Sequence, residues 1–255
     1  MCRWQTYCGP AIYLDQLIYE PEHSLIDQSM HAFESKSAIN ADGVGVGWYG
    51  DRDIPGIYRQ IQPAWNDNNL RNLSHHVSAS LFFAHVRAST GTAVSISNCH
   101  PFVHGNWMFM HNGSISHFAQ IRRDMEAGIP DDAYGQRLGT TDSEAFFLMM
   151  FANGLESTPA AAFRDTIAQV ETIQSAHGLE PDISMAAVVT DGEHITAVRY
   201  SSSSVPPSLY WDGSGNHVTL VSEPFTSDPG QWTEVPPDQV LHASREGIGA
   251  IVALH

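Results

Sequence analysis

The second residue of this 255-residue chain is a cysteine. Aminopeptidases generally remove Met1 when a small side chain follows, and removal would place a thiol and a free α-amine on Cys2. Because the amine has a pKa of about 7.7 to 8.0 and the thiol one of about 8.5, the amine can act as general base for its own nucleophile. Cys2 is therefore a candidate attacking group, although a cysteine at this position can also be an accident of sequence.

Arg87 ends the apolar stretch 83–86 and opens a loop of small residues that contains Gly91. A planar guanidinium at this place could bind a substrate carboxylate through two parallel hydrogen bonds. A surface salt bridge would explain the residue equally well.

Asn112 and Gly113 follow the apolar run Trp107–Met110. Asn-Gly after a strand is a common hairpin turn. The same pair also offers a side-chain amide and an unobstructed backbone N–H, the two donors that an oxyanion hole needs. The local sequence leaves both interpretations open.

Asp142 lies where the segment 139–144 leads into a helical pattern. Either Thr141 or Asp142 could cap that helix, and the Asp142 carboxylate could instead accept the α-ammonium of a substrate opposite Arg87. A thiol, a carboxylate clamp, oxyanion donors and an ammonium acceptor together suit attack on the side-chain amide of a glutamyl group held at its α-carbon.

The elements that must position these residues are short strands and a few helices. Apolar patterning predicts helices over 141–153, 158–177 and 115–127. It predicts strands over 2–8, 44–49, 80–87, 107–111, 184–190, 194–200, 217–222 and 248–254. Helices in the middle with strands on both sides suggest an α+β protein whose two antiparallel sheets stack face to face and carry helices outside. We expect one domain over residues 1–255, in which Ser201–Pro207 connects two strands.

The order of the candidate residues resembles the class II glutamine amidotransferases, whose domain is an N-terminal-nucleophile hydrolase with a four-layer αββα sandwich. The likeness is closest to stand-alone members, which include the γ-glutamyl amidohydrolase of ergothioneine synthesis and the amidohydrolase subunit of glutathione degradation. Four further stretches carry it: Pro21–Leu25, Asn40–Tyr49, Asn98–Phe102 and Ser222–Phe225.

The resemblance implies roles for the candidate residues. Cys2 would be the nucleophile, Asn112 and Gly113 the oxyanion hole, and Arg87 and Asp142 the groups that hold the glutamyl carboxylate and amine. Thr90 stands where the family has a further substrate-binding threonine.

Two departures from the family pattern concern the pocket beside the glutamyl group. Synthase-linked members have Trp directly after this arginine and His after this threonine, where this chain has Ala88 and Gly91. A more open pocket would favour a substituent bulkier than ammonia.

Composition excludes several other functions. Lys+Arg 12 against Asp+Glu 28 gives a net charge of −16, which repels nucleic acids and anionic membranes. The longest apolar run, Ala145–Ala152, is far below the roughly 20 residues of a membrane helix. The N-terminus has no secretory pattern, so we expect a cytoplasmic protein with free thiols at Cys2, Cys8 and Cys99.

No motif predicts a metal or a cofactor. The chain has no His-Glu-x-x-His run and no Cys-x-x-Cys pair, and the alternating glycines Gly43, Gly45 and Gly47 lie on a strand rather than before a helix. We therefore expect an enzyme that hydrolyses a γ-glutamyl amide through a Cys2 thioester, without a cofactor.

Two other functions remain open. The chain could be a glutaminase subunit that supplies ammonia to a separate synthetase, or a glutamyl-binding protein without activity. The expected partner is a small γ-glutamyl molecule, and the sequence leaves open whether the chain also forms homo-oligomers or binds a synthetase.

Overall fold

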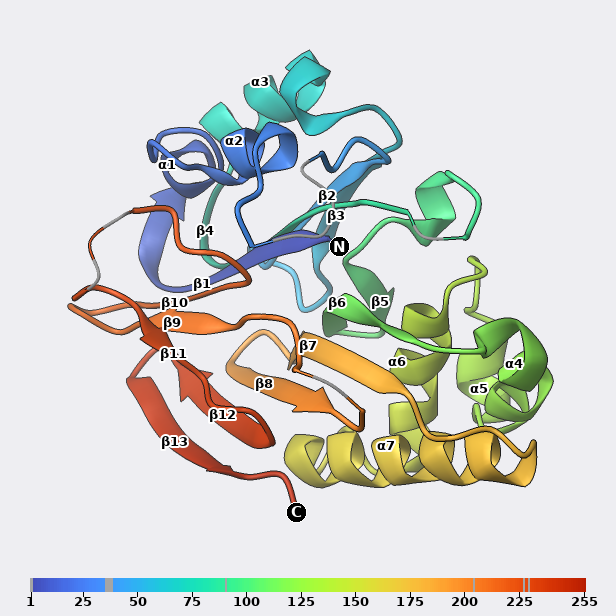
Figure 1. Cartoon of the computed structure of the whole chain (residues 1–255). Coiled ribbons are helices and arrows are strands. Elements are labelled where there is room, and N and C mark those ends of the chain that lie inside the picture. The colour runs from blue at the N-terminus through green and yellow to red at the C-terminus, as the bar shows by residue number, and fades with distance from the viewer. Residues whose placement is uncertain (1, 35–38, 90, 204, 227, 229) are drawn as a thin grey trace.

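The computed structural model describes the whole chain except residues 1, 35–38, 90, 204, 227 and 229. Two antiparallel sheets stack face to face in it, and helices cover the outer face of each sheet (Figure 1). The predicted α+β class and the four-layer αββα order are therefore confirmed. No helix among the described residues is long and apolar enough to cross a membrane.

The first sheet contains both the N-terminal strand and strands from the last third of the chain. Its order is β11 (Thr233–Glu234), β9 (Tyr210–Asp212), β10 (Val218–Val221), β1 (Arg3–Tyr13), β4 (Ser78–Val86), β2 (Val44–Trp48) and β3 (Gly56–Gln60). The helices α1 (Asp15–Ile18), α2 (Leu25–Met30) and α3 (Asn68–His76) cover its outer face (Figure 1).

The second sheet is built mainly from consecutive hairpins. Its order is β13 (Gly247–Ala253), β12 (Gln239–Ser244), β8 (His194–Ser201), β7 (Ile183–Thr190), β6 (Trp107–Ile115) and β5 (Phe102–His104). The helices α4 (Phe118–Ala127), α5 (Asp131–Tyr134), α6 (Asp142–Ala152) and α7 (Pro159–Ala176) lie outside it, and two 3₁₀ turns complete the elements, η1 (Ala64–Asn66) and η2 (Ile96–Asn98).

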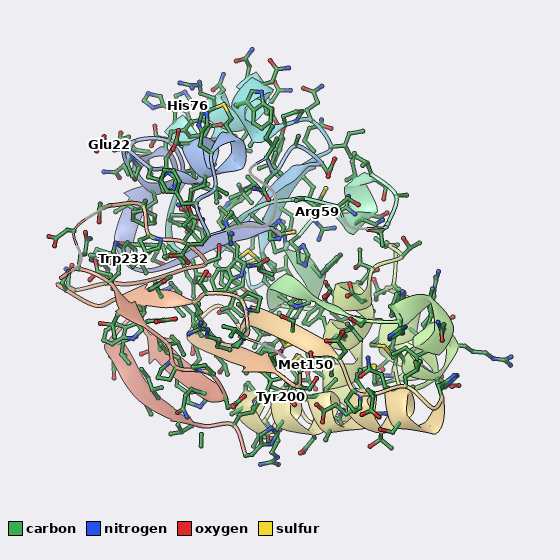
Figure 2. The ribbon with its side chains drawn as sticks, in the orientation of Figure 1. Glu22, Arg59, His76, Met150, Tyr200 and Trp232 are labelled. Atoms are coloured by element: carbon green, nitrogen blue, oxygen red, sulfur yellow. The ribbon has the colours of Figure 1, made fainter. Side chains whose placement is uncertain are left out.

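Alternating side chains of the strands fill the spaces between the layers. Trp4, Phe83 and Met110 are buried between the two sheets. Phe109, the neighbour of Met110 on β6, points the other way and packs under α6 and α7 in the cluster that also holds Met150 (Figure 2). Helix α6 is apolar on all sides because it lies between the second sheet and other helices.

The sequence predictions of the elements need three corrections. Asn112 and Gly113 do not form a hairpin turn, because β6 continues through them to Ile115. The helix predicted from Ile115 begins at Phe118, after His117 has adopted a left-handed φ of 60°. Helices are also not confined to the middle of the chain, since α1 to α3 lie near the N-terminus.

Two other predictions are confirmed. Thr141 caps α6, since its side chain accepts a hydrogen bond from the Glu144 N–H at 3.1 Å, and the alternative that Asp142 is the cap is wrong. The segment 201–207 does connect two strands, β8 and β9, and these belong to different sheets.

Candidate active site

Strand pairing places Cys2 beside Arg87. β1 and β4 are antiparallel with Arg3 opposite Val86, so the residue before β1 meets the residue after β4. The Cys2 thiol, which is half-buried, lies 3.7 Å from the carbonyl oxygen of Ala88. Main-chain pairing therefore holds Cys2 and Arg87 side by side at the ends of two central strands of the first sheet.

The Arg87 side chain is buried and holds its charge among neutral groups. Its exposed fraction is 3%, and its Nη2 donates to Thr92 Oγ1 at 2.7 Å, Ser89 Oγ at 3.2 Å and the Ala93 carbonyl at 3.2 Å. Its Nη1 is buried without a hydrogen-bond partner, and no carboxylate of the described residues pairs with it. The alternative of a surface salt bridge is therefore wrong, and the site has a charge that an anionic ligand would compensate.

Asn112 reaches the same region from the second sheet. The Trp4 indole donates from Nε1 to the Ala186 carbonyl at 3.1 Å, and Ala186 pairs with Asn112 on the neighbouring strand. The first residues of β1 thus face this part of β6. The Asn112 side chain is fully buried, and neither its Nδ2 nor its Oδ1 has a hydrogen-bond partner. An unpaired buried amide is costly unless something else binds it.

Gly113 has a conformation and surroundings that only glycine tolerates. Its φ is +147°, and a Cβ built there would lie 1.9 Å from the Ser184 carbonyl oxygen on β7 and 2.6 Å from His111 Nε2. The strand can therefore approach β7 here only because residue 113 has no side chain.

Asp142 is the first residue of α6, and both of its carboxylate oxygens are held by backbone N–H groups. Oδ2 accepts from Ile115 at 2.8 Å and Oδ1 from Ser143 at 2.8 Å. These bonds tie the start of α6 to the end of β6, three residues beyond Asn112. A second tie comes from His111, whose Nδ1 lies 2.8 Å from Ser143 Oγ.

The space between the sheets near Cys2 contains neutral histidines. His85 pairs with Trp4 across the first sheet and stacks on His100 with ring centroids 4.2 Å apart. Burial lowers the pKa of His85 to about 3 and the pKa of His100 well below its usual value. Burial also raises the pKa of the Cys2 thiol. The thiol is therefore protonated near neutral pH, and neither histidine adds a charge that would ionise it.

Asp42, Gly43 and Ser89 support the site through hydrogen bonds, although their residue types do not suggest a chemical role. Asp42 Oδ2 accepts from the Ser89 N–H at 2.7 Å, and the Arg87 N–H donates to the Gly43 carbonyl at 2.8 Å. These contacts anchor the loop after β4 to the stretch 40–49, which the resemblance had singled out. In the sequence, only their place in a stretch that resembles the family singles out Asp42 and Gly43. Their hydrogen-bond partners lie more than 40 positions away along the chain, so no local pattern predicts these contacts.

Of the remaining positions that the sequence singles out, the structure describes Ala88 and Gly91 but not Thr90. Thr90 lies outside the described residues, so its contact with a substrate stays a prediction. Ala88 is half-buried, and a Cβ at Gly91 would meet no atom within 4 Å. Among the described residues, no group of three His, Cys, Asp or Glu side chains could hold a metal ion.

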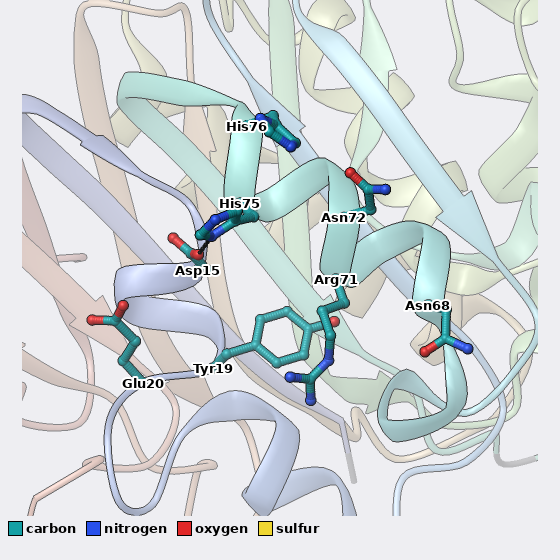
Figure 3. Close-up of a pocket in the computed structure, with 8 residues that line it drawn as sticks. All are labelled: Asp15, Tyr19, Glu20, Asn68, Arg71, Asn72, His75 and His76. Carbon is teal, nitrogen blue, oxygen red and sulfur yellow. Dashed lines mark hydrogen bonds and ion pairs between the residues drawn. The ribbon is translucent and has the colours of Figure 1, made fainter.

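A separate hollow of about 690 Å³ lies on the outer helices of the first sheet (Figure 3). The Arg71 guanidinium lies over the Tyr19 ring there, 4.9 Å from its centroid, and His75 pairs with Asp15 at 2.7 Å. None of the predicted site residues lines this hollow. This hollow is therefore separate from the residues that are predicted to carry the chemistry.

The four layers, two antiparallel sheets between helices, are the fold of the N-terminal-nucleophile hydrolases, and the structure places Cys2 beside the buried Arg87 within it. Comparison with known proteins specifies the family. Residues 23–206 match the family described as glutamine amidotransferases class-II, and the chain belongs to that family.

The relatives found agree with this assignment. The chain is 31% identical to a probable glutamine amidotransferase, DUG3, of Saccharomyces cerevisiae over 97% of this chain and 83% of that protein. It is 27% identical to the gamma-glutamyl-hercynylcysteine sulfoxide hydrolase of Mycolicibacterium smegmatis, with 92% of each covered. A solved glutamine aminotransferase class-II domain protein from Silicibacter pomeroyi superposes with a TM-score of 0.78 at 35% identity over 99% of both chains.

Proposed function

We propose that this protein hydrolyses the amide bond of a γ-glutamyl conjugate and releases glutamate. The observation that carries the proposal is the buried Arg87 guanidinium next to Cys2, which has no carboxylate partner among the described residues and whose Nη1 has no hydrogen-bond partner. A fixed cation beside a thiol suits a substrate with a free carboxylate near a carbonyl group. The names of the two relatives, which concern glutamine and gamma-glutamyl compounds, support the same reading.

In the proposed reaction the Cys2 sulfur attacks the γ-carbonyl carbon, after the α-amine of the processed chain has taken the thiol proton. The oxyanion that forms is stabilised by Asn112 Nδ2, which is unpaired in the structure, and by the Gly113 N–H. The C–N bond then breaks, and the α-amine gives the proton to the departing amine. Water hydrolyses the thioester, which releases glutamate and restores the thiol.

The substrate proposed is a conjugate with a bulky amine rather than free glutamine. The loop after Arg87 has Ala88 and Gly91 where synthase-linked members have Trp and His, and a Cβ at Gly91 would meet no atom within 4 Å. Ala88→Trp should therefore lower kcat/KM for γ-glutamyl peptides and thioethers, while leaving kcat/KM for glutamine within a few-fold of its original value. Equal losses for all substrates would contradict the selection of bulky amines.

The experiment that tests the function combines intact mass with a glutamate-release assay. Processed protein should lack the mass of Met1 and release glutamate from a panel of glutamine, γ-glutamyl peptides and γ-glutamyl thioethers without any added protein. Cys2→Ala should abolish release, whereas Cys8→Ala, which removes a buried thiol from the strand that follows Cys2, should retain it.

Two results would reject the proposal. Retention of Met1 in protein that binds glutamate but does not turn over the panel would indicate a binding protein. Turnover that appears only after a synthetase is added would indicate an ammonia-supplying subunit.

A further inference from the structure

Asn98 is a buried side chain that joins two loops of the site. It is the last residue of η2, its exposed fraction is 1%, and both ends of its amide are used. Nδ2 donates to the Ala93 carbonyl at 2.9 Å and to Thr140 Oγ1 at 3.1 Å. Oδ1 accepts from the Thr140 N–H at 2.8 Å. One short side chain therefore holds two segments that are 47 positions apart.

The two segments are those that carry the charges of the proposed clamp. The Ala93 carbonyl that accepts from Asn98 also accepts from Arg87 Nη2 at 3.2 Å. On the other side, Thr140 immediately precedes Thr141, the N-cap of α6, and Asp142 is the next residue. A continuous path of hydrogen bonds and two peptide links thus leads from the guanidinium to the Asp142 carboxylate.

Close packing leaves this joint little freedom. A Cβ at Gly139 would lie 2.6 Å from Asn98 Oδ1 and 2.6 Å from the Ser97 carbonyl, so the two loops are in direct contact. The buried Glu144 carboxylate accepts from the Leu138 N–H at 3.0 Å and the Gly139 N–H at 2.8 Å. The turn before α6 is therefore held by Glu144 on one side and Asn98 on the other.

We propose that Asn98 is a positioning residue that fixes the separation of Arg87 and Asp142 and thereby makes the site selective for substrates with both an α-carboxylate and an α-amine. The inference rests on the proposed function. The second charged contact adds binding free energy only if the distance between Arg87 and Asp142 is fixed before the substrate binds. Otherwise binding must first order the two loops, and the entropy lost in doing so offsets the contact. Without Asn98, the α-carboxylate of the substrate would still bind Arg87, but the α-amine of the substrate would contribute little to the binding affinity.

The test compares two chromogenic substrates that differ only in the α-amine, γ-glutamyl-p-nitroanilide and glutaryl-p-nitroanilide. The original protein should prefer the first by at least about 100-fold in kcat/KM, the size of one well-placed charged contact. In Asn98→Ala that preference should fall at least tenfold, mainly through a higher KM for the glutamyl substrate.

Asn98→Asp tests the hydrogen bond to the Arg87 loop separately from the hydrogen bond to the Thr140 backbone. Its Oδ1 can still accept from the Thr140 N–H, but a second oxygen would face the Ala93 carbonyl in place of the donor. We expect this variant to lose selectivity as Asn98→Ala does, because the link to the Arg87 loop is broken. If Asn98→Ala does not fold, Asn98→Asp alone decides the question.

Asn153→Ala is the matched control. Its amide joins the end of α6 to α7, with Nδ2 donating to Thr166 Oγ1 at 3.0 Å and Gln169 Oε1 at 3.0 Å, and it belongs to no part of the site. Its melting temperature should fall while its substrate preference stays unchanged.

An unchanged preference in a folded Asn98 variant would overturn the inference even if the original protein is active. The same holds if Asn153→Ala lowers the preference equally. Absence of activity on either anilide and on the wider panel would instead reject the proposed function itself, so the two failures are distinguishable.

Discussion

Glu223 should be one of the most costly carboxylates to remove from this protein. Its exposed fraction is 2%, and Glu223 Oε2 lies 3.0 Å from Nε of Arg3, which is fully buried. Its other contacts are His23 Nε2 at 2.6 Å and the N–H groups of Phe33 at 2.9 Å and Glu34 at 3.0 Å. One carboxylate therefore compensates a buried arginine and holds the loop after α2.

The expected magnitude follows from the charge that remains. Glu223→Ala would remove the ion-pair partner of the buried Arg3 guanidinium, and breaking a buried pair in this way typically costs about 3–5 kcal/mol. A domain of this kind has roughly 5–15 kcal/mol of unfolding free energy, so the variant should lose a large part of it. Activity should fall as well, because Arg3 directly follows Cys2, and Ser222 accepts from the Trp4 N–H at 2.9 Å to hold the same strand.

Urea unfolding followed by tryptophan fluorescence measures this cost. Asp165→Ala is the control, because Asp165 pairs with Arg164 at 2.9 Å on the surface, with side chains 46% and 47% exposed, and its removal should cost less than about 1 kcal/mol. The double variant Arg3→Met/Glu223→Leu should regain most of the lost stability, since both charges are gone.

The reasoning is refuted if Glu223→Ala unfolds within 1 kcal/mol of the original protein. It is also refuted if the double variant is less stable than the single one. The first result would mean that water reaches Arg3, and the second that the carboxylate acts only through its contacts with the 33–34 backbone.

Three further predictions concern the site and its surroundings. Gly113→Ala should lower kcat by about 100-fold or more, since its Cβ would meet the Ser184 carbonyl and displace an oxyanion donor; a fall below tenfold would contradict that placement. Arg87→Lys should raise KM for γ-glutamyl substrates by roughly 10-fold or more at similar kcat, because a single ammonium cannot bind a carboxylate through two parallel bonds; an unchanged KM would remove Arg87 from the carboxylate subsite. Stability should fall as pH drops from about 6.5 towards 4.5, with a slope of roughly 1 kcal/mol per pH unit for each of His85 and His100, because their lowered pKa values leave the folded state with fewer bound protons than the unfolded one. His85→Phe should flatten that slope in urea titrations, and an equally steep slope would show that other groups cause it.

The sequence could predict the layers because the central strands are apolar and β-branched. The stretch 44–49 and the stretch 80–87 are recovered almost to the residue as β2 and β4. The edge strand β3 is half-buried along its whole length and shows no apolar alternation, so its five residues gave no signal. The short helices α1 and α2 are stabilised by packing against the first sheet rather than by their own pattern.

The sequence could suggest candidate residues for the site, but it could not predict the strand pairing and the hydrogen bonds that hold them. The Asn-Gly pair at 112–113 favours a hairpin turn locally, and pairing with β7 on a long strand overrides that preference. The roles proposed for Asn98 and Glu223 depend on partners that are 42 and 220 positions away, and no local pattern encodes such contacts. The role of Asp142 could not be decided from the sequence, because a carboxylate at a helix start can stabilise the helix or bind the ammonium group of a substrate.

The distribution of charge in the site explains why a zwitterionic end group should fit it. Arg87 and Asp142 do not pair with each other or with any other charged side chain of the described residues. Neutral hydroxyls, carbonyls and backbone N–H groups hold each of them, and these fix direction without cancelling charge. In a protein of net charge −16, an isolated buried guanidinium would be a cost unless its ligand supplied the counter-charge. In the proposed function, an α-amino acid end would supply both counter-charges at once, and its side-chain carbonyl would then extend towards Cys2.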